Sequence, residues 1–473
     1  MSPLWNIDDL VAAMDARPVG NVPQGITGIS IDTRSVKAGE AFFAIKGDRF
    51  DGHDFVSQAM KAGAGVAVVA EEKLVMFGAL RLPLLVVSDV LGGLEKLARA
   101  ARARTSARII AVTGSVGKTT TKEMLRIVLS QAGKVHASQA SFNNHWGVPL
   151  TLATIPAGTK FGVFEIGMNH AGEITPLVKM VRPHVALITT IAPAHLGSFA
   201  SVEEIATAKA EIFAGVEAGG TALINCDIKQ FGLLKLLAEQ AGIAQIKTFG
   251  SKRGADFRLV SAQIGAGGSN VRAMTGGRKI EYFLPLAGRH QIINSLGVLG
   301  AVMLAGADVA AAASCMSQIV AENGRGRRHI LALAKGDALL IDESYNANPA
   351  SMHAALKVLG SIEPKGRRIA VLGDMLELGE TSARLHRGLR KAVEDAKPDL
   401  VFLVGGDMKV LAADLPAGVL AGHFSDATKL AEHLPGVLRK GDVVMLKASK
   451  GMKFASVVET LLGAFAANSA AVR

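Results

Sequence analysis

A glycine-rich loop followed by Lys-Thr-Thr is the segment of this chain with the clearest chemistry. The apolar run 108–113 leads into Gly114, and Lys118 and Thr119 follow Gly117 at the start of a helical pattern. Backbone N–H groups of such a loop, together with the helix N-terminus, can bind phosphate oxygens. The lysine can reach the β- and γ-phosphates, and the hydroxyl of the next residue can bind Mg²⁺. The predicted nucleotide site comprises Gly114, Ser115, Val116, Gly117, Lys118, Thr119 and Thr120.

The loop differs from the strict pattern G-x-x-x-x-G-K-[ST], because Val112 stands where that pattern has glycine. It fits the shorter spacing G-x-x-G-K-T-T. An ordinary glycine turn into a helix would account for the glycines, but not for the Lys-Thr-Thr that follows them. Nucleotide binding is therefore the better interpretation.

Polar residues follow two predicted strands beyond the loop. Glu165 lies near the end of the run 162–166, and His195 follows the run 185–190. In a parallel sheet the carboxyl ends of neighbouring strands meet at one edge, where such folds bind ligands. We therefore expect Glu165 to bind the Mg²⁺ that Thr119 and the phosphates also bind, and His195 to be a second functional group there.

Further candidates lie on predicted helices. Lys209, within the helical segment 201–213, is by itself typical of a solvated surface lysine. His290 and Asn294, four residues apart at the start of an apolar helix, share one face and could contact a base or a ribose. A capped helix N-terminus would look similar, so this pair alone does not distinguish the two interpretations.

Polar segments also follow three predicted strands in the last third of the chain, at 342–349, 373–379 and 447–453. The first of them contains Asp342, Tyr345 and Asn346. A plain turn does not need an acid, a tyrosine and amides together, so a binding site is favoured. Because all three segments follow strand ends, they can face one crevice.

Three blocks of alternating pattern would position these residues. The chain mixes strand-like runs with short helical patches up to residue 105, and then alternates strands and helices. From residue 325 it repeats βα units, and the glycine-rich segment 254–277 predicts appended β-hairpins. We predict an α/β fold of three domains: a smaller N-terminal α/β domain (1–105), a central P-loop domain with a doubly wound, mostly parallel sheet (106–324) and a C-terminal Rossmann-like α/β domain (325–473). The predicted strands are 28–31, 41–45, 66–70, 84–87, 109–113, 162–166, 185–190, 221–225, 338–341, 368–372, 400–404 and 442–446, and the predicted helices are 92–104, 118–131, 202–213 and one capped by Asn348.

The composition restricts the compartment and the partners. Hydrophobic residues make up 49% and charged residues 20% of the chain, which is typical of a globular protein. The most apolar stretch, 295–307, is too short to cross a bilayer, and no signal peptide is visible, so we expect no membrane span. Cys226 and Cys315 lie outside any metal-ligand spacing and suit a reducing cytoplasm. The net charge of +11 without an arginine tract favours anionic small molecules over nucleic acid.

Five segments together resemble those of the Mur ligase family, and the resemblance extends over essentially the whole chain. The segment 113–120 is similar to the family's phosphate loop, and 143–152 to its Asn-Asn-x-x-Gly-Val-Pro segment. The segment 165–170 resembles Glu-[Met/Ile]-Gly-x-Asn-His, 191–196 resembles Ile-Ala-Pro-Ala-His-Leu, and 344–349 resembles Ser-Tyr-Asn-Ala-Asn-Pro.

Segments 344–349 and 373–379 are similar to those of the family member that joins D-alanyl-D-alanine to UDP-N-acetylmuramoyl-tripeptide. The resemblance implies an ATP-dependent amide ligase of peptidoglycan precursor synthesis, and thus of cell-wall biogenesis, cell shape and cell division. The terminal carboxylate of the tripeptide would attack the γ-phosphate to give an acyl phosphate, which the amine of D-alanyl-D-alanine then attacks. We expect the protein to act in the cytoplasm as a monomer.

The resemblance also implies roles for single residues. Lys118, Glu165, His195 and Lys209 would form the catalytic centre. One Mg²⁺ would be bound by Thr119 and Glu165 and a second near Glu165 and His195, with Lys209 matching the family's carbamoylated lysine. Closure of the third block over the site would exclude water from the acyl phosphate. Further ATP contacts would be His290, Asn294, Asp342, Tyr345 and Asn346, and substrate contacts Thr33, Arg34, Lys46, Asp51, His53, Asn143 and Asn144.

Other functions fit the sequence less well. A folylpolyglutamate-type ligase would leave the N-terminal block and the segment 344–349 without a role. A switch or motor ATPase would require a strict Walker loop and an aspartate at the end of an apolar strand, and a non-enzymatic binding module would not need ligands from three domains. The sequence does not distinguish meso-diaminopimelate from lysine as the third peptide residue, nor Arg325 from Arg327 as the family's domain-linking arginine.

Overall fold

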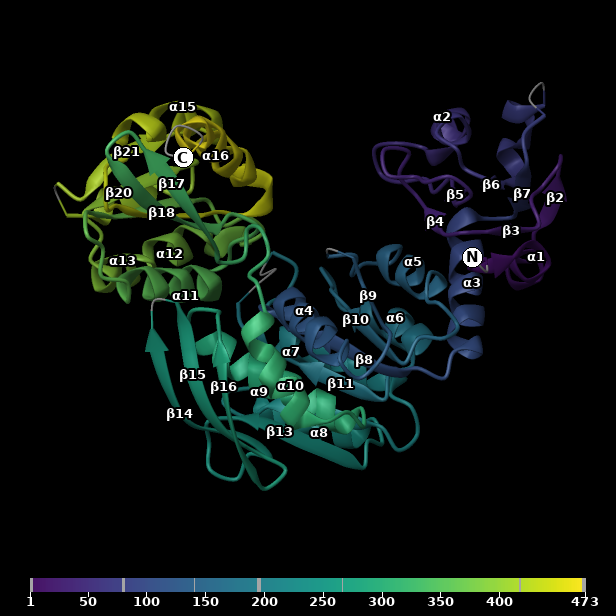
Figure 1. Cartoon of the computed structure of the whole chain (residues 1–473), viewed down its shortest axis with the longest axis horizontal. Coiled ribbons are helices and arrows are strands. Elements are labelled where there is room, and N and C mark those ends of the chain that lie inside the picture. Colours follow the sequence, from purple (N-terminus) through teal and green to yellow (C-terminus); the bar gives the residue numbers. More distant parts are fainter. Residues whose placement is uncertain are drawn as a thin grey trace.

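The computed structural model describes residues 3–78, 81–139, 141–193, 197–265, 267–416 and 418–469. These residues form three successive α/β units, each built around its own sheet. The N-terminal and C-terminal units lie on opposite sides of the central unit (Figure 1). The chain passes from one unit to the next between α3 and β8 and between η4 and β17, and the domain boundaries that we propose, after residues 105 and 324, lie in these two connections.

The N-terminal unit contains a five-stranded sheet in the order β2-β7-β6-β5-β4, in which β2 is antiparallel and the other strands are parallel. The predicted runs 66–70 and 84–87 form strands with those bounds, and every residue in them is buried. The elements are β1 (Trp5–Asn6), α1 (Ile7–Met14), β2 (Arg17–Val19), β3 (Gly25–Ile26), β4 (Ile29–Ser30), β5 (Ala41–Phe43), η1 (Gly52–Phe55), α2 (Val56–Lys61), β6 (Val66–Ala70), η2 (Glu71–Phe77), β7 (Leu84–Val87) and α3 (Val90–Arg104).

The central unit is a nine-stranded sheet in the order β16-β15-β14-β13-β12-β11-β8-β10-β9. Strands β8 to β14 are parallel, and β15 and β16 add an antiparallel extension at one edge. The elements are β8 (Arg108–Thr113), α4 (Lys118–Leu129), β9 (Val135–Ala137), α5 (Gly147–Ala153), β10 (Phe161–Glu165), α6 (Ile174–Val181), β11 (Val185–Ile188), α7 (Val202–Ala210), η3 (Glu211–Gly215), β12 (Thr221–Asn225), α8 (Phe231–Gln240), β13 (Gln245–Gly250), β14 (Phe257–Gly265), β15 (Gly268–Thr275), β16 (Arg278–Leu284), α9 (Arg289–Leu304), α10 (Val309–Cys315) and η4 (Met316–Gln318).

Both faces of the central sheet are covered by helices. Along β8, Ile109 and Ala111 belong to one core with α5, α6, α7 and α8, whereas Ile110 and Val112 belong to the other with α4, α9 and α10. Because β8 is buried on both faces, its sequence is continuously apolar rather than alternating. The predicted doubly wound arrangement is thus present.

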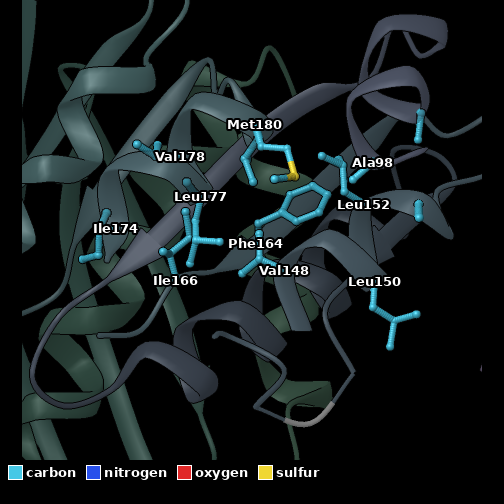
Figure 2. Close-up of a cluster of buried hydrophobic side chains, with 14 of the residues drawn as sticks. Ala98, Val148, Leu150, Leu152, Phe164, Ile166, Ile174, Leu177, Val178 and Met180 are labelled. Carbon is cyan, nitrogen blue, oxygen red and sulfur yellow. The ribbon is translucent and has the colours of Figure 1, made fainter. Parts of the chain in front are cut away.

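Helix α3 leaves the N-terminal sheet and packs on the central unit. Its Ala98 belongs to the same buried cluster as Leu152 of α5, Phe164 of β10 and Met180 of α6 (Figure 2). In addition, the buried Arg102 donates from Nε to the carbonyl of Val181 at 2.8 Å. The first two units therefore share a core on one side of the central sheet.

The C-terminal unit is a six-stranded sheet in the order β17-β18-β22-β19-β20-β21, in which β17 is antiparallel and the other strands are parallel. The predicted helix start is confirmed, because Asn348 accepts a hydrogen bond from the Ser351 backbone N–H and Pro349 is the first helical residue. The elements are β17 (Arg327–Leu333), β18 (Gly336–Glu343), α11 (Pro349–Gly360), β19 (Arg368–Gly373), η5 (Gly379–Thr381), α12 (Ser382–Arg387), α13 (Arg390–Ala396), β20 (Leu400–Val404), α14 (Lys409–Asp414), β21 (Leu420–Phe424), α15 (Ala427–Val437), β22 (Val443–Lys447), η6 (Lys450–Met452) and α16 (Phe454–Ser469).

Some element bounds differ from the sequence expectation. The strand predicted at 185–190 ends at Ile188 because the next residues bond to the phosphate loop instead. The helix predicted at 202–213 changes to a 3₁₀ helix at Glu211. Residues 295–304 of the most apolar stretch lie in α9, in which every residue from 292 to 302 is buried, as expected for a helix packed on all sides. Over the described parts of the chain, no helix combines the length and apolar character that crossing a bilayer requires.

Candidate active site

The phosphate loop lies at the carboxyl edge of the central sheet, between the end of β8 at Thr113 and the start of α4 at Lys118. Gly117 has a φ of +87°, and a Cβ at this position would lie 2.5 Å from Nδ2 of Asn294 on α9. Both the backbone conformation and the available space therefore require glycine. Asn294, which the sequence predicts as a nucleotide contact, lies directly against the loop.

The end of β11 holds the loop in shape. The hydroxyl of Thr189 donates to the carbonyl of Val116 at 2.7 Å, and the backbone N–H of Ser115 donates to the carbonyl of Thr190 at 2.9 Å. The Ser115 hydroxyl is bonded to Ala192 through both its carbonyl and its N–H, each at 3.0 Å. The loop is thus preorganised by contacts with the segment that follows β11, about 75 residues away.

Lys118 folds back over the loop, and its Nζ donates to the carbonyl of Gly114 at 2.8 Å. Burial lowers the pKa of Lys118, while the charge of Glu165 opposes this shift and that of Arg325 adds to it. Next in the chain, the buried hydroxyl of Thr119 lies 3.4 Å from the hydroxyl of Ser141. Lys118, the predicted phosphate ligand, therefore contacts the first residue of the loop. Thr119, the predicted metal ligand, lies beside Ser141 in the segment before α5.

Glu165 is the last residue of β10 and is only 1% exposed. Its Oε1 accepts a 2.6 Å hydrogen bond from Nδ2 of Asn143. Its Oε2 is buried and has no hydrogen-bond partner among the residues that the structure describes. A buried, unpartnered carboxylate oxygen is costly. A hard divalent cation with oxygen ligands would satisfy it, so these residues fit Mg²⁺.

Lys209, near the end of α7, is also only 1% exposed. The interpretation as a solvated lysine, based on the residues alone, was therefore wrong. Within the described part of the chain its ammonium makes no hydrogen bond or ion pair. Burial, with a further contribution from the charge of Lys118, lowers the pKa of Lys209 well below its usual value. The two lysines thus lie near each other.

His195 lies outside the described residues. The backbone N–H of Gly197, two residues further on, donates to the carbonyl of Glu377 in the C-terminal unit at 3.1 Å. This bond joins the segment after β11 to the predicted 373–379 segment after β19. The two units are therefore in contact at this edge.

His290 on α9 faces the C-terminal unit. Burial lowers its pKa, the charge of Glu343 opposes this shift, and that of Lys447 adds to it. Glu343 ends β18 and Lys447 ends β22, so both belong to neighbouring parallel strands. His290 and Asn294 thus lie on the same helix but have different neighbours. Asn294 contacts the phosphate loop, and His290 lies towards the C-terminal sheet.

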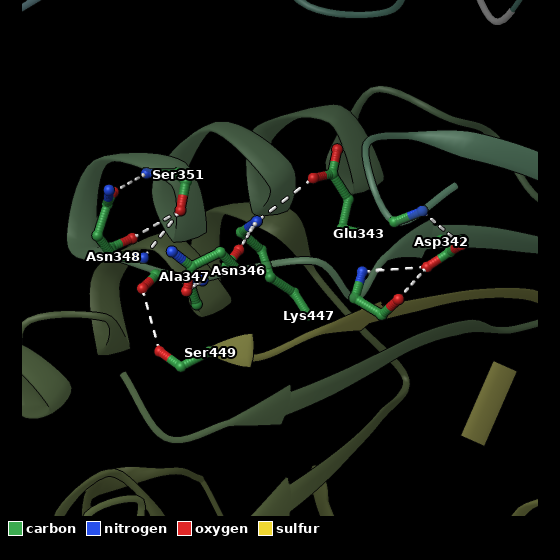
Figure 3. A network of polar contacts seen from close by, with 10 residues as sticks. Asp342, Glu343, Asn346, Ala347, Asn348, Ser351, Lys447 and Ser449 are labelled. Atoms are coloured by element: carbon green, nitrogen blue, oxygen red, sulfur yellow. Dashed lines mark hydrogen bonds and ion pairs between the residues drawn. The ribbon is translucent and has the colours of Figure 1, made fainter. Parts of the chain in front are cut away.

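The polar segment after β18 forms a network of its own (Figure 3). Lys447 Nζ donates to the carbonyl of Asn346 at 3.0 Å and pairs with Glu343 Oε2 at 3.3 Å. The Asn346 Oδ1 accepts from the backbone N–H of Ala347 at 2.9 Å and of Lys450 at 3.3 Å. The segments after β18 and β22 are therefore joined, as their positions at strand ends predict.

Asp342 holds the connection between the central and C-terminal units. Its carboxylate is 3% exposed and accepts hydrogen bonds from the backbone N–H of Gly324 at 2.7 Å and from the N–H and hydroxyl of Ser344. Tyr345 completes this attachment by donating its N–H to the Gly324 carbonyl at 3.1 Å. Asp342 thus positions the linker in this structure.

The structure distinguishes the two linker arginines. The guanidinium of Arg325 lies 3.9 Å from the centroid of the Tyr345 ring and donates to the Ser141 hydroxyl at 3.2 Å. Arg327 is exposed and donates to Asn323 Oδ1 at 2.7 Å. Arg325 therefore reaches the phosphate-loop region and Arg327 does not. Sequence reasoning also missed Ser141, which no local motif marks, and Lys447, which lies in a polar segment that it did identify.

The two asparagines predicted to contact substrate have different surroundings. Asn143 is bonded to Glu165, as described above. Asn144 Oδ1 accepts from the backbone N–H of Gly147 at 3.0 Å, at the start of α5. Asn143 is therefore a neighbour of the expected metal site. Asn144 stabilises the turn before α5 and so helps to position Asn143.

The predicted substrate residues of the N-terminal unit lie at the carboxyl ends of its parallel strands. Arg34 is exposed and forms a two-pronged pair with Asp32, with the shortest contact at 2.6 Å, beside Thr33. After β5, Lys46 pairs through the backbone with Asp51. These residues occupy the loops that follow the neighbouring parallel strands β4 and β5, so the structure brings them to the carboxyl edge of the N-terminal sheet.

The side chains of His53 and Asp51 form a hydrogen-bonded pair. His53 Nδ1 lies 2.6 Å from Asp51 Oδ1, and its Nε2 accepts from the N–H of Ala70 at 2.9 Å. Burial opposes ionisation of Asp51, but the hydrogen bonds from His53 and Lys73 outweigh it and lower its pKa to about 2. Both ring nitrogens of His53 are engaged, so in this structure it orients Asp51.

The whole arrangement suits phosphoryl transfer. A preorganised glycine loop, Lys118 and Arg325 supply positive groups, and Glu165 supplies a carboxylate with an available oxygen. Phosphoryl transfer depends on positioning and on neutralising charge more than on a protein nucleophile. The central site therefore needs no catalytic serine or cysteine.

Comparisons with known proteins cover all three units. The chain matches the models described as Mur ligase family, catalytic domain at residues 25–102, as Mur ligase middle domain at 112–302, and as Mur ligase, glutamate ligase domain at 326–450. The UDP-N-acetylmuramoyl-tripeptide–D-alanyl-D-alanine ligase of Rickettsia prowazekii is 32% identical over 96% of this chain and 99% of its own length.

Solved structures of similar proteins have the same architecture. A crystal structure of MurF from Acinetobacter baumannii aligns with a TM-score of 0.84 and 29% identity, covering 97% of this chain and 99% of that chain. The MurF ligase from Thermotoga maritima in complex with ADP aligns with a TM-score of 0.75 and 26% identity, covering 92% and 96%.

Proposed function

This chain belongs to the Mur ligase family, and we propose that it joins D-alanyl-D-alanine to UDP-N-acetylmuramoyl-tripeptide, with ATP, in the synthesis of peptidoglycan precursors. The observation that carries this proposal is that the similarity to ligases of this reaction extends over nearly the whole chain. The geometry agrees with it, because a phosphate loop, a buried carboxylate and a buried lysine lie together at the carboxyl edge of the central sheet.

We propose the following chemistry. The terminal carboxylate of the tripeptide attacks the γ-phosphorus of ATP, the bond to the β-phosphate oxygen breaks, and ADP leaves. The neutral amine of D-alanyl-D-alanine then attacks the resulting acyl phosphate. Inorganic phosphate leaves with its bonding electron pair, and the amine proton passes to solvent. The products are the amide, ADP and phosphate.

This chain's residues contribute charge and position. Lys118 neutralises phosphate charge, and the N–H groups of the loop bind the phosphate oxygens. Asn294 and His290 bind the adenosine part of ATP. Arg325 approaches the same place from the linker, and Asp342, Tyr345 and Asn346 hold that linker and the neighbouring segment against the site.

We propose that two Mg²⁺ ions are bound by Thr119, Glu165, His195 and Lys209. The unpartnered Oε2 of Glu165 supports a metal at this place. When bound, Mg²⁺ neutralises charge on the transferring phosphoryl group and orients it. Glu165, in turn, is oriented by Asn143.

We further propose that Lys209 is carbamoylated. The amine adds to the carbon of CO₂ and releases one proton, which leaves a carbamate anion in place of an ammonium. A buried amine with no described partner and a lowered pKa favours the neutral form that this addition needs. The carbamate would then serve as an oxygen ligand.

We assign the uridine diphosphate part of the substrate to the N-terminal unit. Thr33, Arg34 and Lys46 offer a hydroxyl and two cations at the carboxyl edge of its sheet, and Asp51 and His53 shape the adjoining loop. A diphosphate suits such cations. We also propose that the protein acts as a monomer in the cytoplasm, in agreement with its two free, buried cysteines.

The proposed function is tested by phosphate release from ATP and Mg²⁺, with UDP-N-acetylmuramoyl-tripeptide and D-alanyl-D-alanine added singly and together. We expect turnover only when both are present. Hydrolysis that is indifferent to both substrates would contradict the proposal and favour a switch or motor ATPase. Parallel assays with meso-diaminopimelate and with lysine in the third peptide position identify the natural tripeptide.

A further inference from the structure

A single carboxylate, that of Glu211, joins the helix that carries Lys209 to the segment that follows Glu165. Glu211 begins η3, which continues α7 without a break. Its Oε1 accepts from the N–H of Gly172 at 2.6 Å, and its Oε2 accepts from the N–H and the hydroxyl of Thr175, both at 3.0 Å. Gly172 lies in the loop between β10 and α6, and Thr175 lies in the first turn of α6.

A second contact joins η3 to α6. A Cβ on Gly215, the last residue of η3, would collide with the backbone of Val178 in α6, so the two backbones are in direct contact. At the other end, the Glu211 carboxylate lies at the N-terminus of α6, where helical N–H groups are unpaired and negative charge is favourable. Element η3 is therefore attached to α6 at both of its ends.

The position of Lys209 depends on this attachment. Lys209 is buried, and no hydrogen bond or ion pair joins its ammonium to another described residue, so none of the described side chains orients it. Its placement therefore follows from the placement of its backbone, two residues before Glu211. Glu165, in contrast, is held by a hydrogen bond from Asn143.

We propose that Glu211 is a positioning residue of the active site, which holds Lys209 in register with Glu165 by binding Gly172 and Thr175. This inference rests on the proposed function, in which Lys209 and Glu165 hold divalent ions. Groups that orient metal ligands without touching the metal affect metal affinity strongly, by about 10- to 100-fold when they are removed.

The chain offers a matched pair of variants. Glu211→Gln preserves the size of the side chain but places an amide N–H group against the N–H donors of the α6 segment. Glu173→Gln is the control, because Glu173 accepts from the N–H of Asn169 at 2.8 Å and pairs with His170 in the same loop, and within the described structure it has no bond to η3. A general loosening of the loop would affect both variants alike.

The measurement is binding of Mn²⁺ in the presence of ADP, followed by the electron paramagnetic resonance signal of free Mn²⁺. We expect the apparent Kd to rise about tenfold in Glu211→Gln and to stay within about twofold in Glu173→Gln. The Mg²⁺ concentration for half-maximal ligase turnover should rise in parallel. Thr175→Val, which removes only the hydroxyl donor to Glu211, should show a smaller rise in Kd and keeps the test usable if Glu211→Gln does not fold.

The outcomes separate this inference from the proposed function. Equal Mn²⁺ binding by wild type and Glu211→Gln, or equal weakening in Glu173→Gln, would overturn the role of Glu211 alone. Should Glu211→Gln fail to fold, unchanged Mn²⁺ binding in Thr175→Val would do the same. A wild-type protein that binds no Mn²⁺ with ADP would overturn the proposed metal site and the role of Glu211 with it.

Discussion

The side-chain amide of Asn143 donates a 2.6 Å hydrogen bond to one oxygen of Glu165, and the other oxygen of that buried carboxylate has no partner among the described residues. One residue thus orients the carboxylate and leaves its second oxygen available. This relationship joins the segment before α5 to the end of β10, which are adjacent only in the folded chain.

Substitution Asn143→Ala should weaken metal binding, because Glu165 loses the group that orients it. We expect the Mg²⁺ concentration for half-maximal phosphate release to rise about tenfold. The measurement is a Mg²⁺ titration of turnover with both substrates present. Asn270→Ala, at an exposed position of β15, provides the control. An unchanged Mg²⁺ requirement in Asn143→Ala would show that Glu165 needs no such partner.

Substitution Gly117→Ala should abolish most nucleotide binding, because the new methyl group would meet Nδ2 of Asn294 as well as strain the backbone. Gly242→Ala is a matched control, since Gly242 has a similar φ of +79° and no atom of the described residues lies near its Cβ position. Both changes should cost about 1–2 kcal/mol of conformational strain. Only Gly117→Ala should weaken ADP binding, which calorimetry measures. Comparable ADP binding in the two variants would contradict the close contact with Asn294.

The two linker arginines should differ in their effect on turnover. Arg325→Ala removes the cation that reaches Ser141 and Tyr345, and we expect kcat to fall on the order of 10²-fold. Arg327→Ala changes an exposed side chain and should alter kcat by no more than about twofold. Steady-state phosphate release gives both values. A larger loss in Arg327→Ala than in Arg325→Ala would reverse the assignment.

The stability of the fold should fall in mild acid because of His184. Burial, assisted by Arg108 and Arg102, lowers the pKa of His184 from 6.5 to about 4, and its Nδ1 accepts from the N–H of Ile109 at 3.0 Å. Between these two pKa values the unfolded chain binds a proton at this position and the folded chain does not. The free energy of unfolding should therefore decrease as the pH falls from about 6.5 to about 4.

Urea unfolding at several pH values measures this effect. In His184→Asn, an amide oxygen can accept from Ile109 and cannot titrate, so the variant should lose less stability than the wild type over the same pH range. Parallel pH profiles for the two proteins would remove His184 as the cause.

Much of the local structure was predictable because it depends on neighbouring residues. The loop 114–120 has glycine where its backbone requires a positive φ, and Asn348 and Pro349 mark the start of α11 through bonds within a single turn. Apolar runs such as 66–70 and 221–225 form strands with the predicted bounds, because continuous burial in a parallel sheet requires continuous apolar sequence. Together with the family resemblance, these local signals determined the α/β class, the family and the identity of most candidate site residues.

Only the tertiary structure decided which of these residues meet. Lys209 has the local pattern of a surface lysine, yet it is buried because α7 packs into the core on one face of the central sheet, near Lys118. Arg325 and Arg327 are equivalent in the sequence, and the stacking of one on Tyr345 separates them. The contacts of Asn143 with Glu165 and of Glu211 with Gly172 and Thr175 join segments 22 to 39 residues apart. Such contacts depend on strand order and on helix packing, which no short stretch of sequence specifies.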